Sequence, residues 1–72
     1  MENKIINIIS SVTSIPEDEL KKNTDDENLW DSIQKVEIVL GIEEEFDIMF
    51  EQEEIANMTN IANICKITGE KL

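Results

Sequence analysis

The sequence predicts a small all-α fold, a three-to-four-helix bundle with a long loop between its first and second helices. Apolar residues recur at helical spacing along much of the 72-residue chain, and no segment shows the alternating pattern of a half-buried strand. The length predicts one domain, residues 1–72, with a thin core. High net charge alone would favour disorder, but 13 isoleucines in periodic positions supply enough apolar surface for folding.

The first helix is expected over residues 3–13, where isoleucines follow the i, i+3, i+4, i+7 pattern. Pro16 ends it, because proline cannot continue the helical hydrogen-bond ladder. A short helical turn can restart at Pro16 and reach Leu20. Residues 21–30 form the long polar loop, in which only Leu29 and Trp30 are candidates to anchor the chain to a core.

The second helix is expected to begin at Asp31-Ser32 and to end at about Phe46. Asp31 and Gln34 have the spacing of a capping box, and Ser32 is an equally suitable N-cap. A short third helix follows over residues 53–58.

A last helix is expected over about residues 60–68. Thr59 or Asn60 can cap its N-terminus, and Gly69 should stop it.

The second helix has two apolar stripes on nearly opposite sides. Because a surface helix of a monomer needs only one such stripe, two interpretations are open. Either the helix is central and buried on both sides, or one stripe packs in the core and the other docks on partner proteins. The first stripe contains Ile38, Val39, Ile42 and Phe46, and the second contains Ile33, Val36 and Leu40, flanked by Glu37, Glu43 and Glu44.

The charge balance restricts the possible partners. The chain has 17 Asp and Glu residues and six lysines but no arginine or histidine, and its net charge is −11. Nucleic-acid backbones and anionic membranes would repel such a chain, so neither is expected as a partner. Proteins with basic patches are the expected partners, which the acidic field would attract from a distance. The segment Met1–Ile9 is too short and too polar for a signal peptide or a membrane span, so a cytoplasmic monomer is expected.

The residue types argue against an enzyme. Without histidine the usual general base is missing, and without arginine there is no bidentate phosphate clamp. No metal site is expected: Asp25-Asp26-Glu27 begins like a calcium loop, but Leu29 and Trp30 occupy the fifth and sixth positions, where an oxygen ligand and a glycine are needed. Cys65 is expected to be an inert thiol in the core, since no basic residue lies at helical spacing from it.

The residues around Ser32 resemble the acyl carrier protein family. Asp31-Ser32-Ile33 at a helix start is similar to the family's Asp-Ser-Leu motif. The run from Val36 to Ile48, Val-Glu-Ile-Val-Leu-Gly-Ile-Glu-Glu-Glu-Phe-Asp-Ile, is similar to its hydrophobic and acidic continuation. The resemblance covers nearly the whole chain. Asp-Ser alone would carry no information, but the combination in an acidic chain of this length is specific.

This resemblance implies a non-enzymatic carrier of acyl or aminoacyl thioesters. Ser32 would receive phosphopantetheine from coenzyme A through a phosphopantetheinyl transferase, beside Asp31. The carrier would serve enzymes of fatty-acid, polyketide or related specialised biosynthesis.

The resemblance also assigns the two stripes. Its docking positions are Ile33, Val36, Glu37, Leu40 and Glu44. The stripe with Ile38, Ile42 and Phe46 would then face an interior that shelters cargo, and Met49 and Met58 suit such an adaptable core.

The sequence departs from the family pattern in the loop before Ser32. Leu29 stands where a glycine is common, Trp30 follows it, and Glu51 replaces a frequent proline at the third helix. Two competing hypotheses remain: an unmodified acidic helical interaction module, and a divalent-ion buffer.

Overall fold

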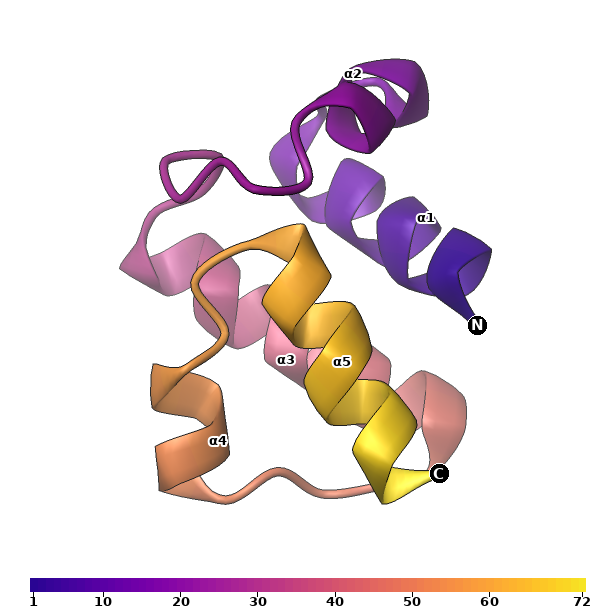
Figure 1. Ribbon diagram of the computed structural model, residues 1–72, viewed down its shortest axis with the longest axis vertical. Coiled ribbons are helices and arrows are strands. Elements are labelled where there is room, and N and C mark those ends of the chain that lie inside the picture. Colours follow the sequence, from indigo (N-terminus) through magenta and orange to yellow (C-terminus); the bar gives the residue numbers. More distant parts are fainter.

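The computed structural model describes residues 1–72 as five helices, and it contains no strand. The predicted all-α fold is therefore confirmed, with five helices where three to four were expected. The long loop spans residues 23–31, because residues 21 and 22, which were expected to lie in it, belong to a helix. None of the helices is both long and apolar enough to cross a membrane. In chain order the helices are α1 (Glu2–Thr13), α2 (Glu17–Lys22), α3 (Ser32–Phe46), α4 (Gln52–Ala56) and α5 (Ile61–Lys71) (Figure 1).

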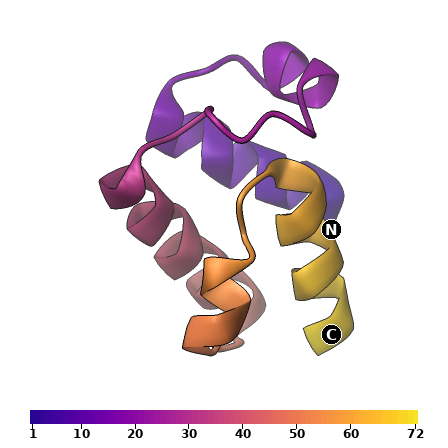
Figure 2. The same cartoon turned by 60° about the vertical axis from the view of Figure 1, so that its left-hand side comes forward.

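Helix α1 organises the bundle, because it packs against α2, α3 and α5. Figure 2 shows α1 running across the upper half of the molecule, with α2 above it and α3 and α5 descending below it. The side chains between these helices form one apolar cluster, which takes in residues on both sides of α4 as well. Its buried members are Ile5, Ile6, Ile9, Leu20, Ile38, Val39, Ile42, Phe50, Met58, Ile61 and Ile64.

Close packing of α1 on α3 depends on Gly41. A Cβ at this position would lie 2.9 Å from Cγ2 of Ile8, closer than two carbon atoms tolerate. Glycine weakens a helix interior by roughly 1 kcal/mol relative to alanine. The missing side chain is what lets the two helices approach.

The segment after Pro16 forms a helix of its own, α2, where the sequence predicted only a possible turn. Acidic residues occupy its first turn and Lys21 and Lys22 its last, an order that complements the helix dipole. Leu20 is fully buried in the core and fixes α2 against α1.

The prediction that Gly69 stops the last helix was wrong. Helix α5 begins after Asn60, whose side-chain oxygen accepts the Asn63 amide at 2.8 Å, and it continues through Gly69 to Lys71. Gly69 does not take the left-handed conformation of a helix stop. A Cβ on Gly69 would lie 3.4 Å from Cε of Met1, so the glycine provides room for the N-terminus.

The other two long helices, α1 and α3, each end at a residue that is not glycine but has a left-handed backbone conformation. Ser14 follows α1 with φ of 64°, and Asp47 follows α3 with φ of 54°. The short polar side chain of Asp47 tolerates this conformation better than most, and at Ser14 the backbone amide donates to the Ser10 carbonyl at 2.8 Å.

Helix α4 is a short segment held mainly at its ends. It contains no buried residue of its own, whereas Phe50 before it and Met58 after it both lie in the core. The Glu54 carboxylate accepts the Glu51 amide at 2.9 Å and pairs with Lys71 of α5, also at 2.9 Å. These two contacts, the amide first, lower the pKa of Glu54.

Three side chains near the end of α3 differ from expectation. Met49 is 80% exposed and is not part of the core, unlike Met58. Glu43 is half-buried, and its Oε2 accepts the Phe50 amide at 2.8 Å, so it holds the α3–α4 connection and does not edge a free surface. Phe46 packs against the core but is only half-buried.

Candidate functional site

The start of α3 is built around Asp31. This residue is the N-cap: its Oδ1 accepts the Gln34 amide at 2.8 Å, and the Gln34 side chain accepts the Asp31 amide at 3.2 Å. The predicted capping box is therefore confirmed. Because Asp31 performs the capping, the hydroxyl of Ser32 is not needed for it.

Ser32 is the first residue of α3, and it is exposed. At a helix start the first backbone amides have no intrahelical acceptor. The capping box engages the Gln34 amide, which leaves the amides of Ser32 and Ile33 free to bind a ligand oxygen. Together with the positive end of the helix dipole, these amides form a favourable environment for a phosphate group.

No other serine in the chain is placed in this way. Ser10 donates its hydroxyl to the Ile15 carbonyl at 2.6 Å, and Ser11 donates to the Asn7 carbonyl at 3.0 Å. Ser14 is exposed, but it lies at the C-terminal end of α1, where the free backbone groups are carbonyls. Carbonyls repel an anion, so only Ser32 combines an exposed hydroxyl with anion-binding amides.

The two stripes of α3 have separate environments. Ile38 and Ile42 are fully buried and Val39 is 5% exposed, so this stripe packs in the core. Ile33, Val36 and Leu40 are 75%, 57% and 54% exposed. The helix is thus not buried on both sides, and the second stripe, starting one residue after Ser32, is a solvent-exposed apolar surface.

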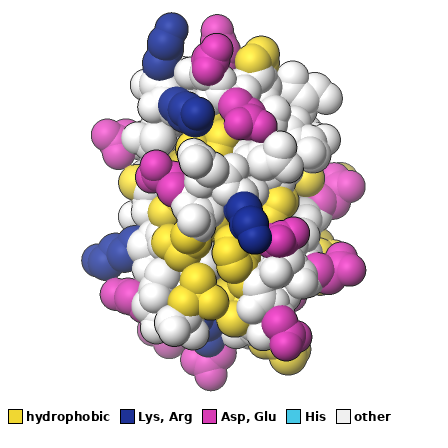
Figure 3. Space-filling view, turned by 90° about the vertical axis from the view of Figure 1, so that its right-hand side faces the viewer, with side chains coloured by type: hydrophobic (Ala, Val, Ile, Leu, Met, Phe, Trp, Pro, Cys, Tyr) yellow, Lys and Arg dark blue, Asp and Glu magenta, His cyan; other side chains and the backbone are white.

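Acidic side chains accompany this surface. Asp31, Glu37 and Glu44 are all exposed, and neither of the two ion pairs of the protein involves them. On the face drawn in Figure 3, hydrophobic side chains gather in the centre and lower half, and most of the Asp and Glu side chains lie toward the edges.

The sequence matches a known family over most of its length. The model of the family described as phosphopantetheine attachment site aligns with residues 3–67. This chain belongs to the phosphopantetheine-attachment family. Domains of this family bear a covalently attached phosphopantetheine and are not themselves catalysts, so the expectations of a carrier, of its cofactor and of a non-enzymatic role are confirmed. No solved structure matches the chain significantly.

The residues at the start of α3 fit a phosphopantetheine group. An exposed serine hydroxyl is available for a phosphodiester, and two free amides beside it suit the phosphate oxygens. When bound, the group supplies a terminal thiol on which acyl groups are carried as thioesters. The chain has no histidine to act as the usual general base for the hydroxyl, and the Asp31 carboxylate accepts the Gln34 amide through Oδ1.

A small groove beside Ser32 was not predicted from the sequence. It encloses about 190 Å³ between the loop before α3, the first turn of α3 and the loop before α5. Trp30, Lys35 and Met58 are among its lining residues. The spacing of Lys35, three residues after Ser32, is the one signal in the sequence that could have indicated that both lie on the same side of the helix.

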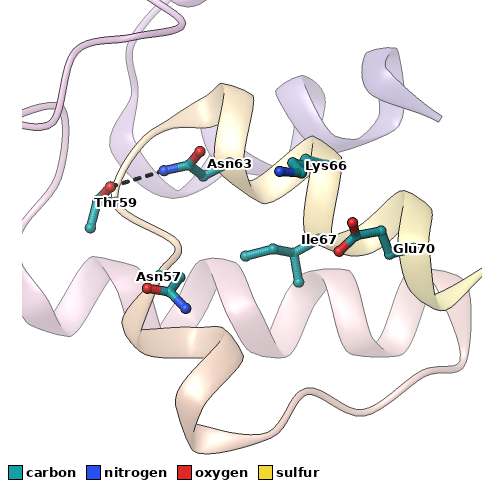
Figure 4. A pocket seen from close by; sticks show the side chains of 6 residues that line it. All are labelled: Asn57, Thr59, Asn63, Lys66, Ile67 and Glu70. Atoms are coloured by element: carbon teal, nitrogen blue, oxygen red, sulfur yellow. Dashed lines mark hydrogen bonds between the residues drawn. The ribbon is translucent and has the colours of Figure 1, made fainter.

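Two larger hollows, each of about 390 Å³, lie elsewhere on the carrier. One is next to α5, where polar and charged side chains surround it and Asn63 donates to Thr59 at 3.2 Å (Figure 4). The other lies beside α1 and contains Lys4 and Glu45, which form a 3.5 Å ion pair. Neither contains a nucleophilic thiol, and no group of three metal-ligating side chains occurs in the structure.

Cys65 is not the carrier thiol. It is half-buried on α5 and packs against the core. Burial, assisted by the nearby Glu2 carboxylate, raises the pKa of its thiol to about 11. The thiol is therefore protonated and unreactive at neutral pH, as the sequence predicted.

Proposed function

We propose that Ser32 is the residue to which phosphopantetheine is attached, and that the protein carries acyl or aminoacyl thioesters between enzymes of fatty-acid, polyketide or related specialised biosynthesis. The observation that carries this proposal is the exposed Ser32 hydroxyl at the start of a capped helix, inside the region that matches the family. A cytoplasmic location accords with a single, unpaired cysteine.

Asp31 and the backbone have distinct tasks in this proposal. Asp31 fixes the first turn of α3 and so holds the Ser32 hydroxyl outward, next to the free amides that receive the phosphate oxygens. A base of the phosphopantetheinyl transferase removes the hydroxyl proton, the serine oxygen forms a bond to the phosphorus next to the pantetheine of coenzyme A, and the pyrophosphate bond breaks so that 3′,5′-ADP leaves. Ser32 is thus the acceptor in a reaction whose catalytic groups belong to the partner.

The exposed stripe of α3 is the proposed docking surface for the transferase and for the enzymes that use the cargo. Ile33, Val36 and Leu40 provide an apolar strip beside the attachment residue. Glu37 and Glu44 add negative charge that attracts basic patches on those enzymes. Apolar contact of modest area with charge steering gives rapid and reversible association, which suits a carrier that visits several enzymes.

The attachment can be tested by intact-mass measurement. The native protein is incubated with coenzyme A and a broad-specificity phosphopantetheinyl transferase, and it should gain the mass of one phosphopantetheine. Ser32→Ala should gain nothing. Ser14→Ala, which removes another exposed serine hydroxyl, should be modified like the native protein.

The absence of an adduct with several different transferases would contradict the proposal. It would favour the alternative in which the chain is an unmodified acidic helical module for protein–protein interaction.

A further inference from the structure

We propose that the groove beside Ser32 holds the phosphate end of the attached arm, with Lys35 pairing with the phosphodiester and Trp30 packing against the first carbons of the arm. The arm would then leave Ser32 along a defined path and would not swing freely from its first bond. This inference rests on the proposed attachment at Ser32 and adds to it a binding surface on the protein.

The groove is a preformed feature of the chain. The Thr59 hydroxyl donates to Glu27 Oε2 at 3.0 Å, and the Ala62 amide donates to the Thr24 carbonyl at 3.1 Å. Both bonds tie the loop before α3 to the segment that leads into α5. Two of the three segments that line the groove are therefore fixed to each other without any ligand.

Lys35 is the one cation of a groove that the carboxylates of Glu27 and Asp31 also line. These two carboxylates accept hydrogen bonds from the Thr59 hydroxyl and the Gln34 amide, whereas Lys35 lies one turn after Ser32 on the same side of α3. Lys35 is half-buried and forms neither of the two ion pairs of the protein. A phosphodiester on a protein of net charge −11 is otherwise surrounded by repulsive carboxylates, so an unpaired ammonium one turn away is its natural partner.

Trp30 and Met58 give the groove its apolar part. Met58 is fully buried, and Trp30 is half-buried and packs against the core, so both are held in place by the fold. Phosphopantetheine has the matching chemistry, because the CH2 group of its phosphate ester is bonded to a carbon that bears two methyl groups. Contact of these methyl groups with an indole ring removes apolar surface from water.

Trp30 also provides the measurement, since it is the only tryptophan in the chain. Apo and holo proteins are prepared, and one phosphopantetheine on Ser32 is first verified by mass. Acrylamide quenching of Trp30 fluorescence is then compared in the two forms. Acrylamide is neutral, so the acidic surface does not exclude it. A docked arm should make quenching weaker in the holo form, whereas free coenzyme A added to the apo protein at equal concentration should have no such effect.

Three variants separate the role of Lys35 from a general effect of charge. Lys35→Gln should reduce the ratio of docked to free arm about two- to fivefold, the range of a partly exposed ion pair, and Lys35→Glu should reduce it further. Lys66→Gln removes the same charge from α5, next to the other hollow, and should behave like the native protein (Figure 4). Circular dichroism verifies that each variant is folded.

Two results would overturn the inference. Equal quenching of the apo and holo proteins would show that the arm does not cover Trp30. Equal protection of Trp30 in holo Lys35→Glu and in the native holo protein would show that the lysine does not hold the phosphate. Either result can occur while the adduct on Ser32 is present, so the attachment itself would stand.

Discussion

Replacing Leu40 or Ile42 with lysine should have opposite consequences for folding, although the two residues are only two positions apart in α3. Leu40 is 54% exposed, and full burial of a leucine contributes about 1.5–3 kcal/mol, so at most about 1.4 kcal/mol of unfolding free energy depends on it. Leucine and lysine have similar helix propensities. A lysine at position 40 would also lie at i+3 from Glu37 and i−4 from Glu44, where each pair contributes about 0.2–0.5 kcal/mol.

Position 42 should not tolerate a lysine, because the side chain of Ile42 is fully buried. Removing a buried isoleucine side chain alone costs about 2–5 kcal/mol, and an unpaired charge in the same place adds several more. A domain of 72 residues has roughly 4–11 kcal/mol of stability in total. Ile42→Lys should therefore be unfolded at 25 °C.

Far-UV circular dichroism with thermal and urea denaturation distinguishes the two variants. Leu40→Lys should retain the native helical signal, with a melting temperature changed by no more than about 8 °C. Its modification by the transferase should be slower, because a cation replaces part of the apolar docking surface. An unfolded Leu40→Lys protein, or a folded Ile42→Lys protein, would show that the faces of α3 are assigned the wrong way round.

Two further predictions concern α5. Asn60→Ala removes the side-chain cap on the Asn63 amide and should cost about 1 kcal/mol, which lowers the melting temperature by about 4–8 °C; an unchanged melting temperature would contradict the capping role. Cys65, with its pKa raised from 9.0 to about 11 by burial, should react with iodoacetamide about a hundredfold more slowly at pH 7 in the folded protein than in urea, since only the thiolate reacts. Equal rates in the two conditions would show that the thiol is not shielded.

The sequence predicted the parts of the fold that depend on local pattern. Apolar spacing placed α1 and α3, and the Asp31–Gln34 spacing placed the start of α3 correctly. Spacing alone could not predict that Ile33 is exposed while Ile38 is buried, because periodicity left both interpretations of the second stripe open. Family resemblance selected the interpretation that the structure supports.

What the sequence could not supply depends on contacts between distant residues. Glycine is the residue type that most often ends a helix, but at Gly69 the space beside the missing side chain is occupied by Met1, from the other end of the chain. Glu43 has the pattern of an exposed acid, yet it binds the Phe50 amide across a turn. The groove that joins Trp30 to Met58 exists only because the loop before α3 is tied to the segment leading into α5.

Localising the attached group tests the central claim most directly. After incubation with coenzyme A and a phosphopantetheinyl transferase, the protein is digested and the modified peptide is sequenced by tandem mass spectrometry. We expect one phosphopantetheine on Ser32, the only serine whose exposed hydroxyl lies next to free backbone amides of a helix. A group attached to Ser14 or to another residue, or a chain that remains unmodified, would contradict it.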